Sequence, residues 1–423
     1  MRERAPKPCE LGEENMVNKK KMWWRWPVAL IVLTLVAAAC GDDSTTPAPA
    51  PQVVTSVSIL EVEVPVQGET VTSVSIVEVP VTVEVMVEPT DPMDLVGDAR
   101  CEANKAAGEI TFLTGFGFFP AISIAVVLAA EDQGFFDEMC LDVNIQPSVP
   151  GESIVLISAN VIQFSTNQIG ELSQAQEQGA QATIVLNWGH TPVHVLLVPE
   201  DSDILVPADF AGKTIGSVGG TLNAGLQGLL LNGGGLSPGD YEVQGRGYDP
   251  FVISEFDGGI AAFRSNEPDT LISNGVPVRV FRPEDYDSVG TFAAIQVSTE
   301  FARLHPTAVE DWVRAVVMAT DWAINNPEDT VRISEGLDTS GYFQFDHEVF
   351  RFTEEVKLSL ASSPEGHNFG AIDDSIVAQE VSALMEFGIL DQLPNMAGLY
   401  TNQYVDAAYD GAGNIIWPGP IGE

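Results

Sequence analysis

The sequence predicts an α/β protein of two lobes that follows an export leader and an extended stalk. Three observations lead to this expectation. The chain of 423 residues opens with a cationic and then apolar leader, continues through a segment rich in Val and Pro, and then alternates short β-branched runs with helical stretches. The part from about residue 109 to 423 exceeds one typical domain, so two lobes are expected.

Residues 1–39 have the pattern of a secretory signal peptide. Lysines and an arginine at 19–25 precede an apolar run at 27–39 that is too short to span a bilayer. The run ends in "AAAC", which resembles the lipobox of bacterial lipoproteins and would make Cys40 the lipidated first residue of the mature chain. Secretion after cleavage at Ala39, without a lipid, is the alternative.

Cysteine usage agrees with export. Cys9 leaves with the leader and Cys40 is used for the lipid, so Cys101 and Cys140 remain and can form a disulfide. Such a bond is compatible with a chain of this size but is not demanded by it. The sequence has no Cys-x-x-Cys pair, which argues against a structural zinc site of that kind.

The charge balance excludes nucleic acid as a partner. The chain has 60 acidic and 19 basic residues, and 56 of the acidic but only 12 of the basic residues follow Cys40. Binding to a phosphate backbone needs clustered Lys and Arg, which this composition lacks.

Residues 40–108 are expected to form a lipid-anchored stalk. The stretch "DDSTTPAPAPQ" is polar and rich in Pro, so it cannot bury enough apolar surface to fold. Two near-copies rich in Val follow, starting at Val54 and Val71, and their alternation favours extended chain that prolines divide into short pieces. We expect a spacer with two short strands; a strand-pairing adhesion element is the alternative.

Strands and helices alternate from residue 109 onward, which predicts parallel sheets covered by helices on both faces. Helices are expected at 121–136, at 224–233 and through most of the chain after Ser298, where caps and i, i+3, i+4 apolar spacing recur. The short β-branched runs that predict strands lie at 109–115, 141–147, 181–188, 194–200, 213–218, 276–281 and 292–297.

Several segments, in order, resemble the solute-binding proteins of ABC importers of the nitrate, sulfonate and thiamine-pyrimidine type. They are "EITFLTGFGFFPAISIAVVLAAEDQGFFDEMCLDVNIQPSV", "ADFAGKTIGSVGGT", "AAFRSNEPDTLISNGVPVRVF" and "HPTAVEDWVRAVVMATDWAINNPEDTV". The resemblance implies the two-lobed periplasmic-binding-protein fold, with ligand in a central cleft. It places lobe 1 at 109–198 and 292–423 and lobe 2 at 199–291, with crossovers near Val198 and Phe292.

Loops that follow strands are the expected ligand contacts, because ligands of open α/β sheets bind beyond the carboxyl ends of the strands. Phe116, Phe118 and Phe119 follow the first strand, where their rings could stack on a flat ligand. Core packing of any of these rings is the alternative. A dinucleotide loop is disfavoured because its third glycine position is Pro120, which suits a helix start.

Asn167, Trp188 and His190 follow two further strands of the first lobe. Asn167 could orient a ligand and Trp188 could stack on it, although turn chemistry and core packing account for them as well. His190 and His194 are separated by roughly 13 Å of extended chain, too far for both to bind one ion unless Pro192 bends the chain, so we expect no metal.

Thr221, Asn266 and Glu267 are the candidates in the second lobe. Thr221 stands at an expected helix start, where free N–H groups attract an anion or a carbonyl oxygen, or where it acts only as an N-cap. Glu267 could accept hydrogen bonds from an amino-substituted ring with Asn266 beside it; a solvated surface carboxylate is the alternative.

Two stretches resemble enzyme motifs, but each lacks a feature that its motif requires. Gly212-Lys213-Thr214 lacks the earlier glycine of a phosphate loop, because Pro207 stands there. The stretch "GLSPG" at 235–239 follows a helical run, and its Pro removes an N–H that an oxyanion hole needs.

The sequence therefore predicts a non-enzymatic, monomeric receptor without cofactor, lipid-anchored at the extracytoplasmic face of the cell membrane. It would pass a small aromatic heterocycle, a thiamine-pyrimidine precursor or a flavin-like vitamin such as riboflavin, to an ABC permease and its ATPase. A binder of sulfonate, nitrate or another small anion is one alternative, although only Arg246 and Arg264 are near the candidate loops. An exported enzyme on the same fold and a surface interaction protein are the others.

Overall fold

The structure is a computed structural model that describes residues 62–66, 69–73, 97–148, 151–339, 341 and 343–418. The chain divides into two compact units, residues 1–84 and 85–423. In the first unit, β1 (Val62–Val66) pairs antiparallel with β2 (Glu69–Ser73). This hairpin falls where the two Val-rich near-copies predict short strands. The predicted signal peptide and the predicted lipidation site Cys40 lie outside the described residues.

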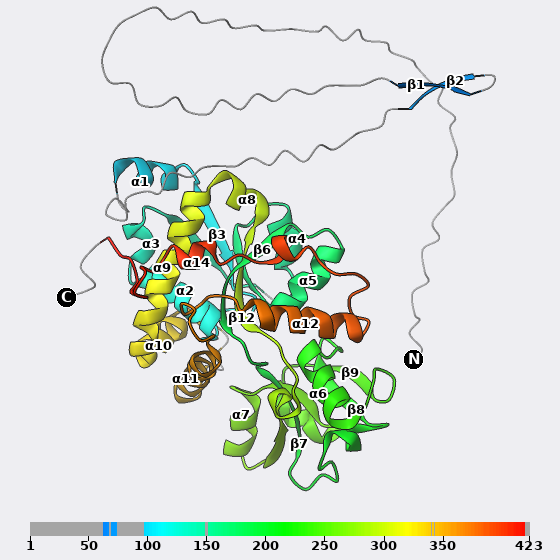
Figure 1. The fold of residues 1–423 in the computed structure, drawn as a ribbon. Helices are drawn as coiled ribbons and strands as arrows, with labels where there is room; N and C mark the ends of the chain where they lie inside the picture. Colours follow the sequence, from blue (N-terminus) through cyan, green and yellow to red (C-terminus); the bar gives the residue numbers. More distant parts are fainter. Residues whose placement is uncertain are drawn as a thin grey trace, which may run out of the picture. The chain divides into compact units, whose positions relative to one another are not determined.

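The second unit contains two five-stranded sheets (Figure 1). The first sheet has the order β4-β3-β5-β12-β6, and its strands are β3 (Glu109–Leu113), β4 (Asp142–Gln146), β5 (Phe164–Asn167), β6 (Ala182–Gly189) and β12 (Phe292–Ser298). The second has the order β11-β7-β10-β8-β9, and its strands are β7 (His194–Pro199), β8 (Thr214–Val218), β9 (Glu242–Arg246), β10 (Ile260–Phe263) and β11 (Val278–Phe281).

Both sheets are mixed, whereas the sequence predicts parallel ones. In the first sheet β3 runs parallel to β4 and β5, but β12 is antiparallel to both β5 and β6. In the second sheet β8 is parallel to β9 and β10, but β7 is antiparallel to β10 and β11. The reversed strands β7 and β12 are those that the chain enters directly from the other sheet, so no helical crossover sets their direction.

Helices flank both sheets. Lobe 2 is the second sheet with α6 (Ala224–Gly234), α7 (Glu267–Ser273), η2 (Pro207–Phe210), η3 (Pro250–Glu255) and η4 (Pro283–Tyr286). Lobe 1 is the first sheet with α1 (Asp98–Lys105), α2 (Ile122–Asp132), α3 (Phe135–Glu138), α4 (Ser153–Ser158), α5 (Ile169–Glu177), α8 (Thr299–Leu304), α9 (Pro306–Asn325), α10 (Pro327–Leu337), α11 (Phe345–Ser362), α12 (Asp374–Glu386), α13 (Met396–Leu399) and α14 (Gln403–Asp406). Among the described residues, none of these helices has the length and apolarity needed to cross a bilayer.

The first crossover between the lobes lies earlier than the sequence predicts. Because β7 pairs only within the second sheet, the chain leaves lobe 1 at residues 190–193 and not near Val198. The apolar pattern of 194–199 identifies a strand but not the sheet that the strand joins, which explains the difference. The chain returns to lobe 1 where β12 begins, at Phe292.

The core of lobe 1 is built around Trp312 of α9, which is fully buried. The ring of Phe164 stacks on Trp312 with centroids 3.9 Å apart, and Phe136 stacks on it at 5.7 Å. In lobe 2, alternate residues of β7 are buried in different apolar clusters: Leu196 belongs to one and Val195 to the other. A strand buried on both faces gives the continuous apolar run seen in the sequence.

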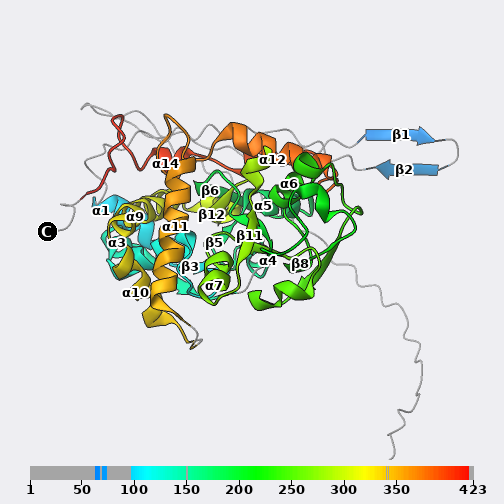
Figure 2. The same ribbon diagram turned by 90° about the horizontal axis from the view of Figure 1, so that it is seen from below.

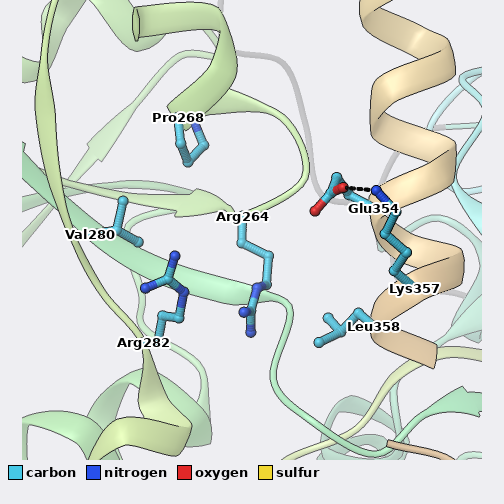
Figure 3. A pocket seen from close by; sticks show the side chains of 7 residues that line it. All are labelled: Arg264, Pro268, Val280, Arg282, Glu354, Lys357 and Leu358. Atoms are coloured by element: carbon cyan, nitrogen blue, oxygen red, sulfur yellow. Dashed lines mark hydrogen bonds and ion pairs between the residues drawn. The ribbon is translucent and has the colours of Figure 1, made fainter. Parts of the chain in front are cut away.

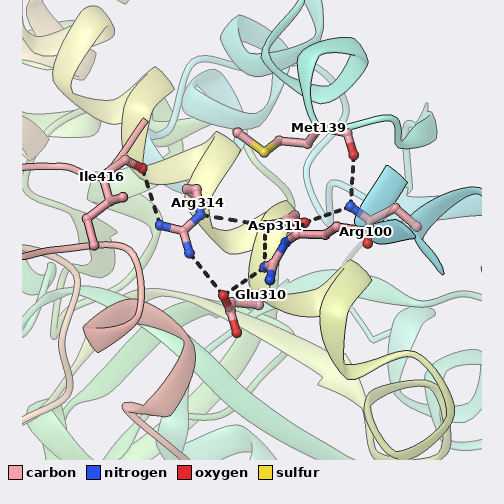
Figure 4. A network of polar contacts seen from close by, with 7 residues as sticks. Arg100, Met139, Glu310, Asp311, Arg314 and Ile416 are labelled. Atoms are coloured by element: carbon pink, nitrogen blue, oxygen red, sulfur yellow. Dashed lines mark hydrogen bonds and ion pairs between the residues drawn. The ribbon is translucent and has the colours of Figure 1, made fainter. Parts of the chain in front are cut away.

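The folded domain begins at α1, inside the segment that the sequence assigns to the stalk. Cys101 of α1 forms a disulfide with Cys140. Arg100 donates to both carboxylate oxygens of Asp311, at 2.8 and 2.7 Å, and Asn104 donates to Asp311 Oδ2 at 2.7 Å (Figure 4). A polar helix with few apolar residues is therefore fixed by charge and a covalent bond, which the stalk boundary at 108 does not anticipate.

Candidate ligand-binding site

The strand directions bring the candidate loops of both lobes to one place. Because β5 and β6 are both antiparallel to β12, they end at the edge of the first sheet where β12 starts. The same argument in the second sheet puts the ends of β8, β9 and β10 beside the start of β7. The two crossovers join these edges, so the loops after the strands face each other. We call this region the interlobe junction, and it is where ligands of such sheets bind.

The turn after β3 carries an exposed phenylalanine into the interlobe junction. Gly115 has φ +80°, and a Cβ there would lie 2.6 Å from Thr166 Oγ1, so the turn requires glycine. The Phe116 side chain is 40% exposed and packs edge-to-face on Phe263 of lobe 2, with ring centroids 6.1 Å apart. Phe116 is therefore a lobe 1 residue that contacts lobe 2 while keeping a free ring face.

The other two phenylalanines of this turn are less accessible than Phe116. Phe118 is half-buried. Phe119 is also half-buried, and the Arg351 guanidinium lies over its ring, 5.3 Å from the centroid. The turn thus offers one exposed ring to the junction and one ring already covered by a cation.

Glu267 lies at the start of α7, buried against the end of β10. Its Oε2 accepts a hydrogen bond from the Phe263 N–H at 2.8 Å, and its Oε1 lies 3.6 Å from Arg246 Nη2. Burial raises the pKa of Glu267, while the Phe263 N–H and the Arg246 charge oppose that rise. Because 3.6 Å exceeds hydrogen-bond length, Oε1 keeps the capacity to accept a donor from a ligand.

Arg246, at the end of β9, is neutralised inside lobe 2. Its side chain is 2% exposed and donates to the carbonyl oxygens of Gly247 and Ala261, each at 2.8 Å. Together with Glu267 it forms a buried ion pair at the carboxyl edge of the second sheet, so this edge offers a local dipole and no net charge.

Helix α11 supplies side chains to the junction that the loop-based prediction missed. Glu355 Oε2 accepts the Ile122 N–H of lobe 1, and its Oε1 accepts the Ser265 hydroxyl of lobe 2, each at 2.9 Å. Arg351 donates to Asn266 Oδ1 at 2.7 Å. His347, Arg351 and Glu355 are spaced four residues apart, so they share one helix face. That polar stripe is the sequence signal that would have revealed them.

These contacts make α11, which lies beside α7 of lobe 2 in Figure 2, a bridge between the lobes. His347 Nδ1 lies 2.9 Å from Asp269 Oδ2, and its Nε2 lies 2.9 Å from Asn266 Oδ1. Asn266 is thus engaged by two side chains of α11, and Glu355 is buried between both lobes. Burial raises the pKa of Glu355, opposed by the hydrogen bonds from Ile122 and Ser265 and by the Arg351 charge.

Two of the other candidates, Trp188 and Thr221, do not have the roles that the sequence suggests for them. Trp188 is 1% exposed and belongs to the lobe 1 core, so it offers no ring face for stacking. Thr221 is exposed and is not the N-cap of α6, because that helix begins at Ala224 and Asn223 caps it through the Leu226 N–H at 3.0 Å. A Gly-Gly-Thr sequence resembles a helix start, but the chain needs two more residues to enter α6.

Asn167 and His190 are held by neighbouring protein groups. Asn167 donates to Gln296 Oε1 at 2.9 Å. His190 is 7% exposed, and its Nε2 accepts the Asp373 N–H at 3.3 Å. Burial lowers the pKa of His190. His190 therefore fastens the first crossover to the C-terminal segment, and no group of three or more metal-ligating side chains occurs in the described part of the chain.

The architecture is that of the periplasmic-binding proteins. A protein of Bordetella bronchiseptica has a TM-score of 0.53 at 18% identity, covering 70% of this chain and 96% of that chain. The periplasmic aliphatic sulphonate binding protein SsuA of Escherichia coli has a TM-score of 0.52 at 15% identity, covering 69% of this chain and 91% of that one. The predicted fold class is thereby confirmed.

Residues 121–330 match the family model described as NMT1/THI5 like. A formylaminopyrimidine-binding protein of Halalkalibacterium halodurans is 22% identical over 305 residues, which are 70% of this chain and 91% of that protein. The family resemblance predicted from the sequence is therefore confirmed.

Proposed function

We propose that this protein is the extracytoplasmic receptor of an ABC importer and captures a small aminopyrimidine between its two lobes without making or breaking a bond. The interlobe junction supports this proposal most directly: the exposed Phe116 ring of lobe 1 packs on Phe263 of lobe 2, and the Glu267 carboxylate accepts the Phe263 N–H. The similarity to a formylaminopyrimidine-binding protein supports the ligand class.

Recognition would combine stacking with hydrogen bonding. Phe116 supplies a ring face at the junction, and Glu267 Oε1 supplies an acceptor for an exocyclic amino group. The charge of the buried Arg246 offsets part of the cost of burying an ionised Glu267, whose pKa burial raises. Closure of lobe 2 on lobe 1 through α11 would then exclude water from the ligand.

We also propose that Cys40 carries a lipid and that the segment up to α1 acts as a tether at the membrane. The lipobox-like ending of the leader supports this role. The tethered, monomeric receptor would hand its ligand to a permease driven by an ATPase.

Phe116→Ala should weaken binding of a formylaminopyrimidine by roughly tenfold, because the variant loses one ring face of the stack. Equilibrium binding by isothermal titration calorimetry on the whole protein measures this. Leu337→Ala is the control, because Leu337 at the end of α10 is 42% exposed, about as much as Phe116 at 40%. Equal losses in both variants would remove Phe116 from the site.

The effect of Glu267→Gln on ligand affinity should distinguish a receptor for pyrimidines from a receptor for small anions. The variant loses a charged acceptor and leaves Arg246 without its carboxylate, so formylaminopyrimidine affinity should fall by roughly tenfold while affinity for an alkanesulfonate should stay equal or rise. Competition between these two compounds and riboflavin on wild-type protein provides the reference. Tighter wild-type binding of the sulfonate than of the pyrimidine would contradict the proposal.

A further inference from the structure

A cavity lies between lobe 2 and α11. It has a volume of about 270 Å³. Figure 3 shows Arg264 and Arg282, which directly follow β10 and β11 of the second sheet, with Lys357 and Leu358 on the α11 side. Its lining is completed by Pro268, Val280 and Glu354.

The cavity concentrates positive charge on a strongly acidic protein. Three of the 12 basic residues that follow Cys40 line it. Against 56 acidic residues in the same part of the chain, such a concentration makes the cavity a local attractor for anions.

The cationic side chains Arg264, Lys357 and Arg282 differ in how strongly they pair with other protein groups. Arg264 Nη1 pairs with Glu284 at 2.5 Å. Lys357 pairs with Glu354 at 2.7 Å, but their side chains are 65% and 38% exposed, so the pair is weak and easily replaced. Arg282 is exposed, and its guanidinium has no hydrogen bond or ion pair with any described residue.

We propose that this cavity binds a small multivalent oxyanion such as inorganic phosphate and that the bound anion holds lobe 2 against α11. A planar guanidinium donates two parallel hydrogen bonds to an oxyanion, and the Lys357 ammonium adds a point charge from the opposite wall. The rest of the lining includes apolar surface from Val280, Leu358 and Pro268. A compact anion could therefore be bound by the cationic side chains at the sides of the cavity. The proposal stands independently of the ligand proposed for the interlobe junction.

The test is a phosphate titration of the whole protein at constant ionic strength, with chloride as the balancing anion and no pyrimidine present. We expect saturable binding by calorimetry and a rising midpoint of thermal unfolding. Arg282→Gln should weaken phosphate binding roughly tenfold, because it removes a charge-assisted donor pair. Hydrogen exchange should slow in both α7 and α11 when phosphate binds.

Arg303→Gln is the matched control, because Arg303 forms an exposed pair with Glu300 on α8 and does not line the cavity. It should bind phosphate as the wild type does. Lys357→Gln is the second variant on the opposite wall and should also weaken binding. Absence of saturable binding to the wild type, equal losses in the Arg303 and Arg282 variants, or protection confined to one of the two helices would each overturn the proposal.

Discussion

Asp311→Asn should lower the free energy of unfolding by about 3 kcal/mol, the lower end of the range for breaking a buried ion pair, because it takes one of two carboxylates from two buried guanidinium groups. Asp311 is fully buried and accepts hydrogen bonds from Arg100 and Asn104, and Arg314 Nε lies 3.5 Å from its Oδ1. Glu310 remains to pair with both arginines, at 2.7 and 3.0 Å, which limits the loss. Chemical denaturation of the two proteins measures the difference.

The control for this experiment is Glu300→Gln, which breaks the exposed ion pair with Arg303 at the surface of α8. That change should leave stability nearly unaltered, because exposed pairs contribute little. The network in Figure 4 ties α1 to α9, and Arg314 also donates to the Ile416 carbonyl near the C-terminus. Equal effects of the two substitutions would show that this network does not hold the domain's N-terminal helix.

The free energy of unfolding should also fall as pH rises through the titration of Glu380. This carboxyl is 5% exposed, and burial raises its pKa from the ordinary 4.5 to about 7, opposed by hydrogen bonds from Thr291 and the Gly170 N–H and reinforced by Glu171. The folded state therefore holds the proton more tightly than the unfolded state. Its contribution is complete below pH 4.5 and is lost as pH approaches and passes about 7.

The loss amounts to roughly 3 kcal/mol, since each pKa unit corresponds to about 1.4 kcal/mol. Glu380→Gln mimics the protonated form and should flatten this part of the pH profile relative to the wild type. Glu386→Gln is the control, because Glu386 is an exposed carboxylate on the same helix. The prediction fails if the Glu380 and Glu386 variants have the same pH dependence of stability.

Glu380 also bears on function because it lies where the lobes join. Thr291 Oγ1 donates to Glu380 Oε2 at 2.7 Å, and Thr291 directly precedes β12 at the second crossover. A Cβ at Gly170, near the start of α5, would lie 2.8 Å from Glu380 Oε1. Protonation of Glu380 therefore changes the charge next to the second crossover and next to the start of α5, which follows a loop of the interlobe junction.

Much of the fold could be predicted because each strand and helix has a local pattern. The strands at 109–113 and 214–218 and the helices at 122–132 and 224–234 fall where apolar periodicity predicts them. Sheet partners could not be predicted, because β7 has the same apolar run whichever sheet it joins. The first crossover was placed too late for this reason.

The candidate site was predictable only in part. The turn after β3 was correctly placed at the carboxyl edge of a sheet, since strand ends and glycines are local features. The prediction that Trp188 stacks on a ligand was wrong. Its ring is 1% exposed, and burial of a lone Trp depends on elements that are distant in sequence. Arg351 and Glu355 were missed because α11 lies more than 200 residues from the turn that they contact.

The sequence by itself determined the α/β domain of the periplasmic-binding type and predicts an export-type leader and an extended segment before it, since composition, strand pattern and motif order are local properties. Only the tertiary structure decided which side chains meet. Buried charges such as Glu267 and Glu355 need partners to offset their desolvation, and those partners come from other strands or from the opposite lobe. Such pairing depends on the three-dimensional path of the chain, which no local pattern encodes.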